Sequence, residues 1–302
     1  MAVARVPSTD LSRTAETLEM IVPRWSVWVV MTLASQPEAL RYSDLKSRLP
    51  WLADGQLHPR LRTLGEAGLV ERTALSRMHV TYGLTDRGRD LLPVLEALAA
   101  WGDQCLDKQL VETKVVKDGK TAVEMRPERI PAAQNAEDAL SLISHRHTTA
   151  LLWTLKLRGT ATMAALRQEA MPGLGESSVY TPVYRLIEDG LVAVSRSEET
   201  SPDVQVEEVV HLHLTKAGEA LAPVYRAVSA WAAGRSQADA NAHPLWGVPG
   251  LPASARAGQW TAHRARQAVR PAVPATQPPA PVPAMAWKPA ELFSTPTTGP
   301  CR

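Results

Sequence analysis

Cysteine is scarce in this chain of 302 residues, which contains only Cys105 and Cys301. Two cysteines cannot form a disulfide framework or a four-cysteine zinc site, and so few are typical of a reducing compartment. An excess of charge of one sign is also lacking, because 33 Lys and Arg oppose 31 Asp and Glu and give a net charge of +2. This balance excludes a histone-like polycation and a strongly acidic tail, but a local basic patch remains possible.

Long hydrophobic runs are missing as well. The most apolar stretch, residues 25–34, is bounded by Arg24 and Gln36 and is too short to span a bilayer. The N-terminal residues lack the uninterrupted apolar core of a secretory signal. We therefore expect a cytoplasmic protein without a membrane partner.

Catalytic motifs are absent too. The sequence has no phosphate-binding glycine loop, no Ser-His-Asp signature and no carboxylate pair in a catalytic context. The pairs His145 with His147 and His211 with His213 have the spacing of metal ligands, but no third ligand accompanies either pair. We expect no enzyme activity, no metal and no cofactor, and we interpret Cys105 as a small buried hydrophobe rather than a redox sensor.

An internal repeat is the first positive feature. The segment LRTLGEAGLV at 61–70 corresponds to VYRLIEDGLV at 183–192, and LTDRGRDLLPVLEALAAW at 84–101 corresponds to LTKAGEALAPVYRAVSAW at 214–231. The offset between the copies grows from 122 to 130 positions, so the second copy has eight additional residues between these two blocks. The ordered blocks indicate a tandem duplication.

The sequences of both copies predict the same series of secondary-structure elements. An apolar helix (25–35 or 148–157) comes first, and a short helix with Ser43 as the N-cap of the first copy follows. A third helix begins near Asp54 or Ser177 and ends at a glycine, and a β-hairpin follows it. A last helix is capped by Thr85 or Thr215. Helix, helix, helix, hairpin, helix is the order of a winged helix-turn-helix, so the fold class is mainly α with small β wings.

These patterns predict four regions. Two tandem winged helix-turn-helix domains cover 15–110 and 136–234, and a linker at 111–135 contains a β-hairpin that turns at Asp118-Gly119. Residues 235–302 contain twelve of the 24 prolines and lack apolar periodicity. We expect this Pro/Ala-rich C-terminal segment to be a disordered tail, because it cannot bury enough apolar surface to offset its ordering entropy.

The third helix of the first copy has a polar face opposite its leucines. Leu57, Leu61 and Leu64 form the buried stripe, and Gln and Arg on the other face suit adenine and guanine in the major groove. The DNA-binding candidates are Gln56, His58, Arg60, Arg62 and Thr63 on this helix, Arg41 and Ser43 at the preceding helix, Arg72, Arg77 and His79 on the wing, and Arg185 in the second copy. Pro59 leaves open whether the helix starts later than Asp54 or has a distorted first turn.

Residues 24–104 resemble the HxlR-type winged helix-turn-helix regulators of bacteria. The resemblance rests on Trp25, Arg41-Tyr42-Ser43-Asp44-Leu45, Gly68-Leu69-Val70-Glu71-Arg72, Tyr82-x-Leu84-Thr85 and Gly88-Arg89-x-Leu91-Leu92-Pro93. The second copy is less similar, and its SSVYTPVYRLIEDGLV has features of the related PadR regulators. The resemblance implies that a dimer binds a pseudo-palindromic site on double-stranded DNA and that the protein is associated with the nucleoid. It also implies a kink at Pro93.

The two copies differ in charge. The second copy has Pro182 and Tyr184 where the first has Arg60 and Arg62, and its longer wing (196–208) has one Arg against five acidic residues. Because phosphate neutralisation supplies most non-specific DNA affinity, we expect the first copy to be the main reader of DNA. The predicted function is transcriptional regulation, most commonly repression.

Three alternatives remain open. The chain is either an intramolecular pseudo-dimer or a homodimer. A winged-helix module that senses a ligand or binds a protein, with little DNA binding, is the competing function. The nine tryptophans beside a single Phe are explained by core packing, although a small aromatic effector between the copies is an alternative.

Overall fold

The computed structural model describes residues 8–76, 79–117, 120–175, 177–199 and 207–247. They form two compact units. The first unit is Arg24–Ala139, and the second unit combines residues 8–23 with residues 140–247. None of the helices in these ranges is long and apolar enough to cross a membrane.

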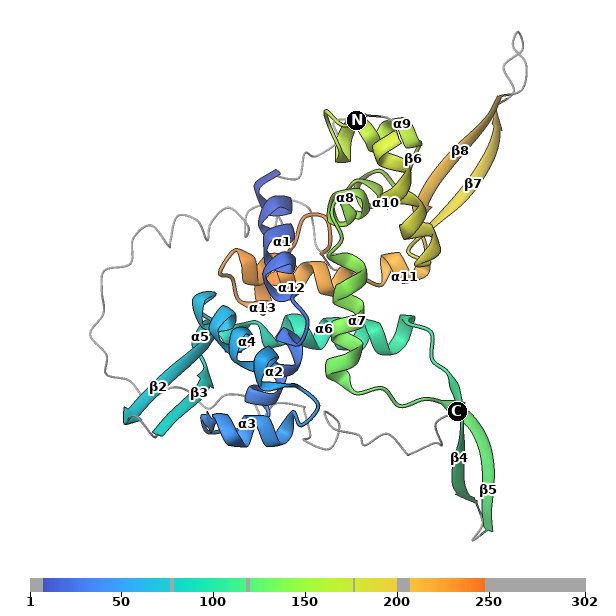
Figure 1. The fold of residues 1–302 in the computed structure, drawn as a ribbon. Helices are drawn as coiled ribbons and strands as arrows, with labels where there is room; N and C mark the ends of the chain where they lie inside the picture. Colours follow the sequence, from blue (N-terminus) through green and yellow to red (C-terminus); the bar gives the residue numbers. More distant parts are fainter. Residues whose placement is uncertain (1–7, 77–78, 118–119, 176, 200–206, 248–302) are drawn as a thin grey trace. The chain divides into compact units, whose positions relative to one another are not determined.

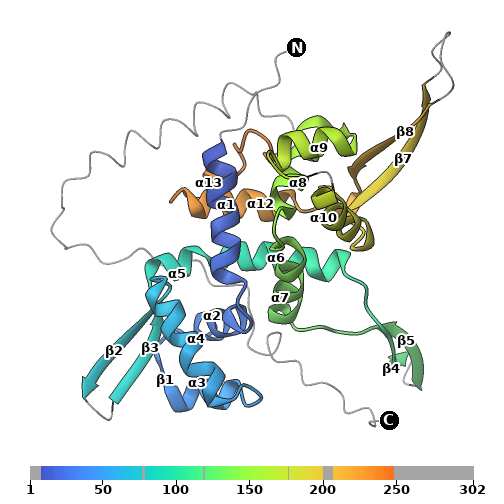
Figure 2. The same cartoon turned by 45° about the horizontal axis from the view of Figure 1, so that its top comes forward.

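The first unit contains a helical core with a three-stranded sheet at one side (Figures 1 and 2). Its elements are α2 (Ser26–Ala34), β1 (Leu40–Arg41), α3 (Tyr42–Arg48), α4 (Asp54–Glu66), β2 (Val70–Ser76), β3 (His79–Leu84), α5 (Asp86–Asp90), α6 (Leu92–Cys105), β4 (Leu110–Lys117), β5 (Lys120–Pro127) and most of α7 (Ala132–Ile143). The strand order is β1-β3-β2, with antiparallel pairing throughout. This is the order of a winged helix-turn-helix, with β2 and β3 as the wing.

The second unit repeats this order. It contains α1 (Ser8–Ile21), the end of α7, α8 (Thr148–Arg158), β6 (Thr160–Ala161), α9 (Met163–Ala170), α10 (Ser177–Glu188), β7 (Val192–Glu199), β8 (Glu207–Leu214), α11 (Lys216–Glu219), α12 (Ala222–Ala232) and α13 (Gln237–Ala240). The order of its three strands is β6-β8-β7, which corresponds to β1-β3-β2. Both units are therefore mainly helical with small antiparallel sheets.

The sequence dictates the core of the first unit through its apolar pattern. Ser26 to Leu33 of α2 are all buried, as expected for a helix with almost no polar side chains. Leu57, Leu61 and Leu64 of α4 are at most 4% exposed, so the predicted leucine stripe faces inward. Because α4 is held by one face only, its opposite face is available to solvent.

A threonine–glycine clasp closes the wing in the same way in both units. Thr85 Oγ1 donates to the carbonyl of Gly68 (2.6 Å) and accepts from the amide of Gly88 (3.0 Å). Thr215 Oγ1 donates to Gly190 (2.6 Å) and accepts from Gly218 (3.1 Å). Both threonines thus cap the following helix, as predicted, and also tie it to the end of α4 or α10.

Two local expectations differ from the structure. The second helix begins at Tyr42 with Arg41 as its N-cap, so Ser43 lies inside the first turn and is not the cap. The predicted kink at Pro93 is instead a break, because α5 ends at Asp90 and Pro93 lies in the first turn of α6. Proline is tolerated there, since the first helical N–H groups have no intrahelical acceptor.

The chain remains ordered beyond both predicted limits of the winged domains. Helix α1 begins at Ser8 and contacts α12 of the second unit, where Thr14 Oγ1 and Ser229 Oγ lie 3.0 Å apart. Residues 15–23, predicted as the start of the first winged domain, therefore group with the second unit. After Gly234, where a disordered tail was expected, α13 forms and Trp246 is fully buried. The remainder of the predicted tail, 248–302, lies outside the described residues.

Candidate nucleic-acid interface

Helix α4 presents a polar face because its leucines are buried on the other side. Gln56, Arg62 and Thr63 are exposed, and the side chain of Arg62 is 82% exposed. Gln56 is in the first turn of the helix and Arg62 is less than two turns further along the chain. A polar helix face of this length fits the major groove of B-DNA, where Gln and Arg recognise adenine and guanine.

Pro59 lies inside α4, which settles where the helix begins. The helix starts at Asp54, and Pro59 follows after more than one turn. Proline has no N–H, so Pro59 cannot donate to the carbonyl of Gly55. The helix nevertheless continues to Glu66, and the hydroxyl of Thr63 donates to the carbonyl of Pro59 over 3.0 Å. The first of the two alternatives, a later start, is excluded.

Three side chains fix the start of α4 relative to α3. The rings of Tyr42 and His58 are stacked, with centroids 4.1 Å apart and an interplanar angle of 6°. The hydroxyl of Tyr42 donates to Asp54 Oδ1 over 2.7 Å. Burial, together with the carboxylate of Asp54, raises the pKa of Tyr42 to about 12, so the phenol stays protonated and remains a donor. This cluster orients the exposed imidazole of His58 at the edge of the polar face.

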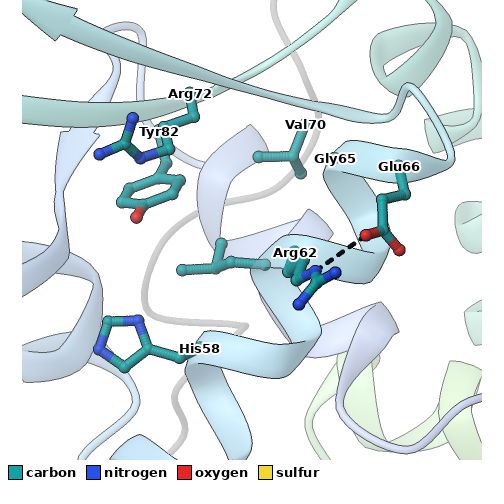
Figure 3. A pocket seen from close by; sticks show the side chains of 8 residues that line it. His58, Arg62, Gly65, Glu66, Val70, Arg72 and Tyr82 are labelled. Atoms are coloured by element: carbon teal, nitrogen blue, oxygen red, sulfur yellow. Dashed lines mark hydrogen bonds and ion pairs between the residues drawn. The ribbon is translucent and has the colours of Figure 1, made fainter.

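A groove separates α4 from the wing (Figure 3). Its volume is about 480 Å³, and its lining residues are His58, Leu61, Arg62, Gly65, Glu66, Val70, Arg72 and Tyr82. Arg62 enters it from the helix and Arg72 from the strand β2, so two guanidinium groups lie along an otherwise partly apolar floor. Arg62 Nε donates to Glu66 Oε1 over 2.9 Å, which orients the Arg62 side chain along the helix.

The wing and the start of α3 supply further cations. Arg72 on β2 is exposed, and Arg41 Nη2 lies 3.1 Å from His79 Nδ1, joining β1 to β3. Ser43 is exposed in the first turn of α3, where amide groups are available to an anion. Arg77, the remaining wing candidate, lies outside the described residues.

Arg60 is placed differently from the other candidates on α4. It is only partly exposed, and its Nε is buried without a hydrogen-bond partner among the described residues. Burial lowers the pKa of Arg60, while the negative charge of Glu137 on α7 opposes that shift. Arg60 therefore lies on the flank of the polar face, one helical turn after Gln56, where it is partly buried and within the electrostatic influence of Glu137.

Glu137 is a residue that the sequence did not single out. Its carboxylate accepts from the amide of Trp25 (2.5 Å) and from Trp28 Nε1 (3.2 Å). Trp25 has a left-handed backbone (φ 75°), a strained conformation for a bulky residue, and the bond to Glu137 holds it there. No spacing in the sequence links positions 25 and 137, so only the folded chain reveals this contact.

The corresponding helix of the second unit has a different exposed face. Counted back from the glycines that end the two helices, Tyr180 and Tyr184 of α10 stand where α4 has His58 and Arg62. Their rings are stacked with centroids 6.1 Å apart, and they are 40% and 55% exposed. Arg185 is exposed beside them. This face is aromatic where that of α4 is basic.

The remaining candidate chemistry is not assembled in the structure. No cluster of three or more His, Cys, Asp or Glu residues suitable for a metal occurs in the described part of the chain. His211 and His213 are both partly buried on β8, and His213 pairs with Thr160 of β6. Burial raises the pKa of the Cys105 thiol, which disfavours the reactive thiolate.

Comparison with known proteins adds independent evidence for the first unit. Residues 20–110 match the HxlR-like helix-turn-helix family. The chain is 32% identical over 88 residues to the HTH-type transcriptional regulator YdzF of Bacillus subtilis, covering 28% of this chain and 80% of that protein. It is 26% identical over 102 residues to the regulator YvaP of the same bacterium, covering 33% and 93%.

A regulator from another bacterium is also similar to this chain. The chain is 28% identical over 109 residues to the HTH-type transcriptional regulator YtfH of Escherichia coli, covering 35% of this chain and 82% of that protein. No solved structure matches the chain significantly. The family match covers α2 to α6 and ends at the first residue of β4.

Proposed function

This chain belongs to the HxlR-like helix-turn-helix family, and we propose that it binds double-stranded DNA through α4 and regulates transcription. The observation that carries this proposal is the exposed polar face of α4 beside a groove with Arg62 and Arg72. Side chains on such a face reach base edges, and cations on its flanks neutralise phosphates. The proposal involves no catalytic step.

In the proposed complex, each group has a defined role. Gln56, Arg62 and Thr63 enter the major groove, and His58 contacts its edge. Arg72, together with the Arg41–His79 pair, contacts the sugar–phosphate backbone beside the groove. Ser43 adds a phosphate contact at the start of α3. A promoter covered in this way is closed to polymerase, so repression is the expected outcome.

We further propose that the second unit arose by tandem duplication of the first and has diverged, with a PadR-like third helix. The threonine–glycine clasp and the sheet order recur in both units, which supports a common origin. The predicted domains at 15–110 and 136–234 remain proposals, with α1 (including residues 15–21) and the segment 235–247 assigned to the second unit. The stacked tyrosines on α10 favour a protein-interaction role for the second unit.

The symmetry of the expected operator depends on which helices of the assembly enter the major groove. A homodimer presents two copies of α4 to a pseudo-palindromic site, with half-sites separated by about 34–36 Å. An intramolecular pseudo-dimer would instead use α4 with α10, and the two half-sites would then differ in sequence.

Selection of genomic fragments by the purified full-length chain tests the proposal. A DNA-binding regulator retains a small set of fragments that share a motif, and added salt weakens retention. A chain with lost DNA binding, the alternative function, retains no fragment above background even at low salt. Footprinting of the retained fragments then gives the half-site spacing and symmetry.

A further inference from the structure

The hairpin β4–β5 lies outside the family match, except for its first residue, and has no assigned role. It extends away from the helices of the first unit in both views (Figures 1 and 2). The two strands pair in a continuous antiparallel register from Leu110↔Pro127 to Lys117↔Lys120. Within the described ranges β4 pairs with β5 alone, so its outer edge has no strand partner.

Apolar side chains are exposed on one face of this hairpin. Leu110, Val123 and Met125 are 61%, 59% and 57% exposed. Val123 and Met125 stand opposite Lys114 and Glu112, so all five side chains share one face. An isolated two-stranded hairpin is only marginally stable in water, and exposed apolar clusters commonly mark contact surfaces. Together with the unpartnered outer edge of β4, these features make the hairpin suited to contact another polypeptide.

The sequence of β4 is complementary to itself about Thr113. In an antiparallel pairing of two β4 strands centred on Thr113, residue 112 stands opposite residue 114 of the other strand, and residue 111 opposite residue 115. Glu112 thus faces Lys114 twice, once on each side of the axis, and Val111 faces Val115 twice. Both charged side chains are exposed, and opposite charges placed in this way stabilise strand pairing.

The backbone geometry is consistent with the same register. Only two residues separate Lys117 from Lys120, so this flanking pair is hydrogen-bonded within the hairpin. Hydrogen-bonded and non-hydrogen-bonded pairs alternate along antiparallel strands. The amide and carbonyl groups of Glu112 and Lys114 therefore point outward from the hairpin. In the Thr113-centred register these outward groups are opposite one another.

We propose that β4 pairs with β4 of a second copy of this chain, forming a four-stranded antiparallel sheet about a twofold axis at Thr113. The contact is isologous, so each copy contributes the same edge and the assembly closes as a dimer. The inference does not depend on DNA binding, because association is measured without DNA.

Other registers do not offer this complementarity. Centring the pair on Glu112 or Lys114 places two like charges opposite each other, which is destabilising. Pairing through the outer edge of β5 about Glu124 likewise brings two glutamates together. Centring that pairing on Met125 would place Glu124 opposite Arg126, but these two side chains are already paired within β5 over 2.9 Å, and Pro127 lacks the N–H that this register needs opposite Val123. The Thr113-centred pairing of β4 places unlike charges and valines opposite each other at every position from 111 to 115, with Thr113 on the axis.

A charge exchange in the full-length chain tests this register. Glu112→Lys gives two cations on each edge and Lys114→Glu gives two anions, so either variant alone should weaken self-association by on the order of tenfold. An equimolar mixture of the two variants should recover association, because one edge is then positive and the other negative. Sedimentation velocity measures all four samples, wild type included. Glu128→Lys and Arg129→Glu, the same charge changes just beyond the hairpin, should leave association unchanged.

A second experiment tests directly whether the twofold axis passes through position 113. In a chain with Cys105→Ser and Cys301→Ser, Thr113→Cys should form a disulfide-linked dimer on mild oxidation, because the two Thr113 positions form a close non-hydrogen-bonded pair. Thr121→Cys on β5 is the matched control and should stay monomeric on a denaturing gel. A wild-type chain that is monomeric, single variants that associate as the wild type does, a mixture that fails to recover association, or equal cross-linking at 113 and 121 would each overturn the proposal.

Discussion

Arg62 and Arg72 line the same groove from opposite sides, but they are constrained differently. Arg62 is tied to Glu66 on its own helix, whereas Arg72 extends from the exposed strand β2. An exposed ion pair of this kind contributes little to stability, so Glu66 orients the guanidinium at little cost to its availability for DNA. In the second unit the position of Arg62 is occupied by Tyr184, and Arg185 is the neighbouring cation.

Replacement of Arg62 or of Arg185 should distinguish the contributions of the two units to DNA binding. Arg62→Ala removes a proposed guanine contact and should weaken specific binding by about 1–3 kcal/mol, roughly 5- to 150-fold. Arg185→Ala, the matched control on α10, should have a much smaller effect. Gel-shift titrations on a selected fragment measure both. Equal losses would show that the two helices contribute equally and would contradict the assignment of α4 as the main reader.

His243 predicts a pH-dependent stability of the second unit. The buried ring lies with Nε2 2.9 Å from Asp10 Oδ2, and Nδ1 accepts from the amides of Leu245 and Trp246. Burial lowers the pKa of His243, and Arg235 and Arg226 act in the same direction, whereas Asp10 opposes the shift. Because the folded-state pKa is the lower one, stability is complete above the ordinary histidine value of about 6.5 and decreases as pH falls through the folded-state pKa.

Thermal unfolding at pH 7.5 and pH 5 checks this expectation. The wild type should unfold at a lower temperature at pH 5, and His243→Gln should reduce the difference between the two pH values. His58→Gln, at an exposed histidine of the first unit, should retain the wild-type difference. An unchanged difference in His243→Gln would exclude this histidine as the cause.

At the scale of elements, the clasp depends on the close approach of a helix to a backbone carbonyl. A Cβ added at Gly88 would lie 2.1 Å from the carbonyl oxygen of Leu69, and one added at Gly218 would lie 2.3 Å from that of Leu191. Real Cβ atoms do not come so close, so α5 or α11 would have to move away. Glycine at these two positions is therefore a packing requirement of the fold.

Alanine substitutions measure this requirement. Gly88→Ala and Gly218→Ala should each destabilise the unit that contains them by about 1–3 kcal/mol. Gly55→Ala in α4 is the control, because an added Cβ there meets nothing within 4 Å. It should stabilise the helix by about 0.5–1 kcal/mol. Denaturant unfolding gives all three values, and a neutral Gly88→Ala would mean that the clasp is looser than described.

The elements that the sequence predicted are those with local signals. The leucine stripe of α4, the capping threonines and the terminal glycines are short-range patterns, and the structure has them at the expected positions. The misjudged features depend on distant partners. Asp10 contacts His243 across 233 positions, and Thr14 contacts Ser229 across 215. No periodicity in the sequence shows such contacts, so the sequence does not predict the ordered segment after Gly234.

The candidate site was predictable to a similar extent. Composition and helical period placed Gln56 and Arg62 on one exposed face, as the structure has them. Arg60 lies on the flank of this face as the helical period predicts, but its partial burial near Glu137 does not follow from the local sequence, because Glu137 belongs to a helix far along the chain. The stacking of Tyr42 on His58 also depends on the turn between α3 and α4, whose geometry the sequence did not specify.

At the scale of the whole molecule, the near-neutral charge is unevenly distributed. Residues 24–104 contain ten Lys and Arg against nine Asp and Glu, while residues 146–234 contain eight against ten. The positive charges proposed to contact DNA are therefore few and are confined to one surface of the first unit. The salt dependence of binding should accordingly be shallow, because its slope reports the number of neutralised phosphates.

Arg72→Ala tests this view. It should weaken binding to all DNA sequences alike and lower the steepness of the plot of log K against log salt by about one. Arg129→Ala, which removes the same charge beyond the hairpin, should leave the slope unchanged. Fluorescence anisotropy titrations at several salt concentrations give these slopes. A slope unaffected by Arg72→Ala would place the phosphate contacts elsewhere.

The clasp also has a consequence for protein engineering. The hydrogen bond from the threonine hydroxyl closes a segment of 17 positions in the first unit and of 25 in the second, with the same 2.6 Å geometry. Closing the longer loop costs only about 0.3 kcal/mol more in chain entropy. Additional residues between β7 and β8 should thus cost the second unit little stability. An epitope tag or a small fluorescent peptide placed there should leave the helical core intact and mark the second unit for imaging.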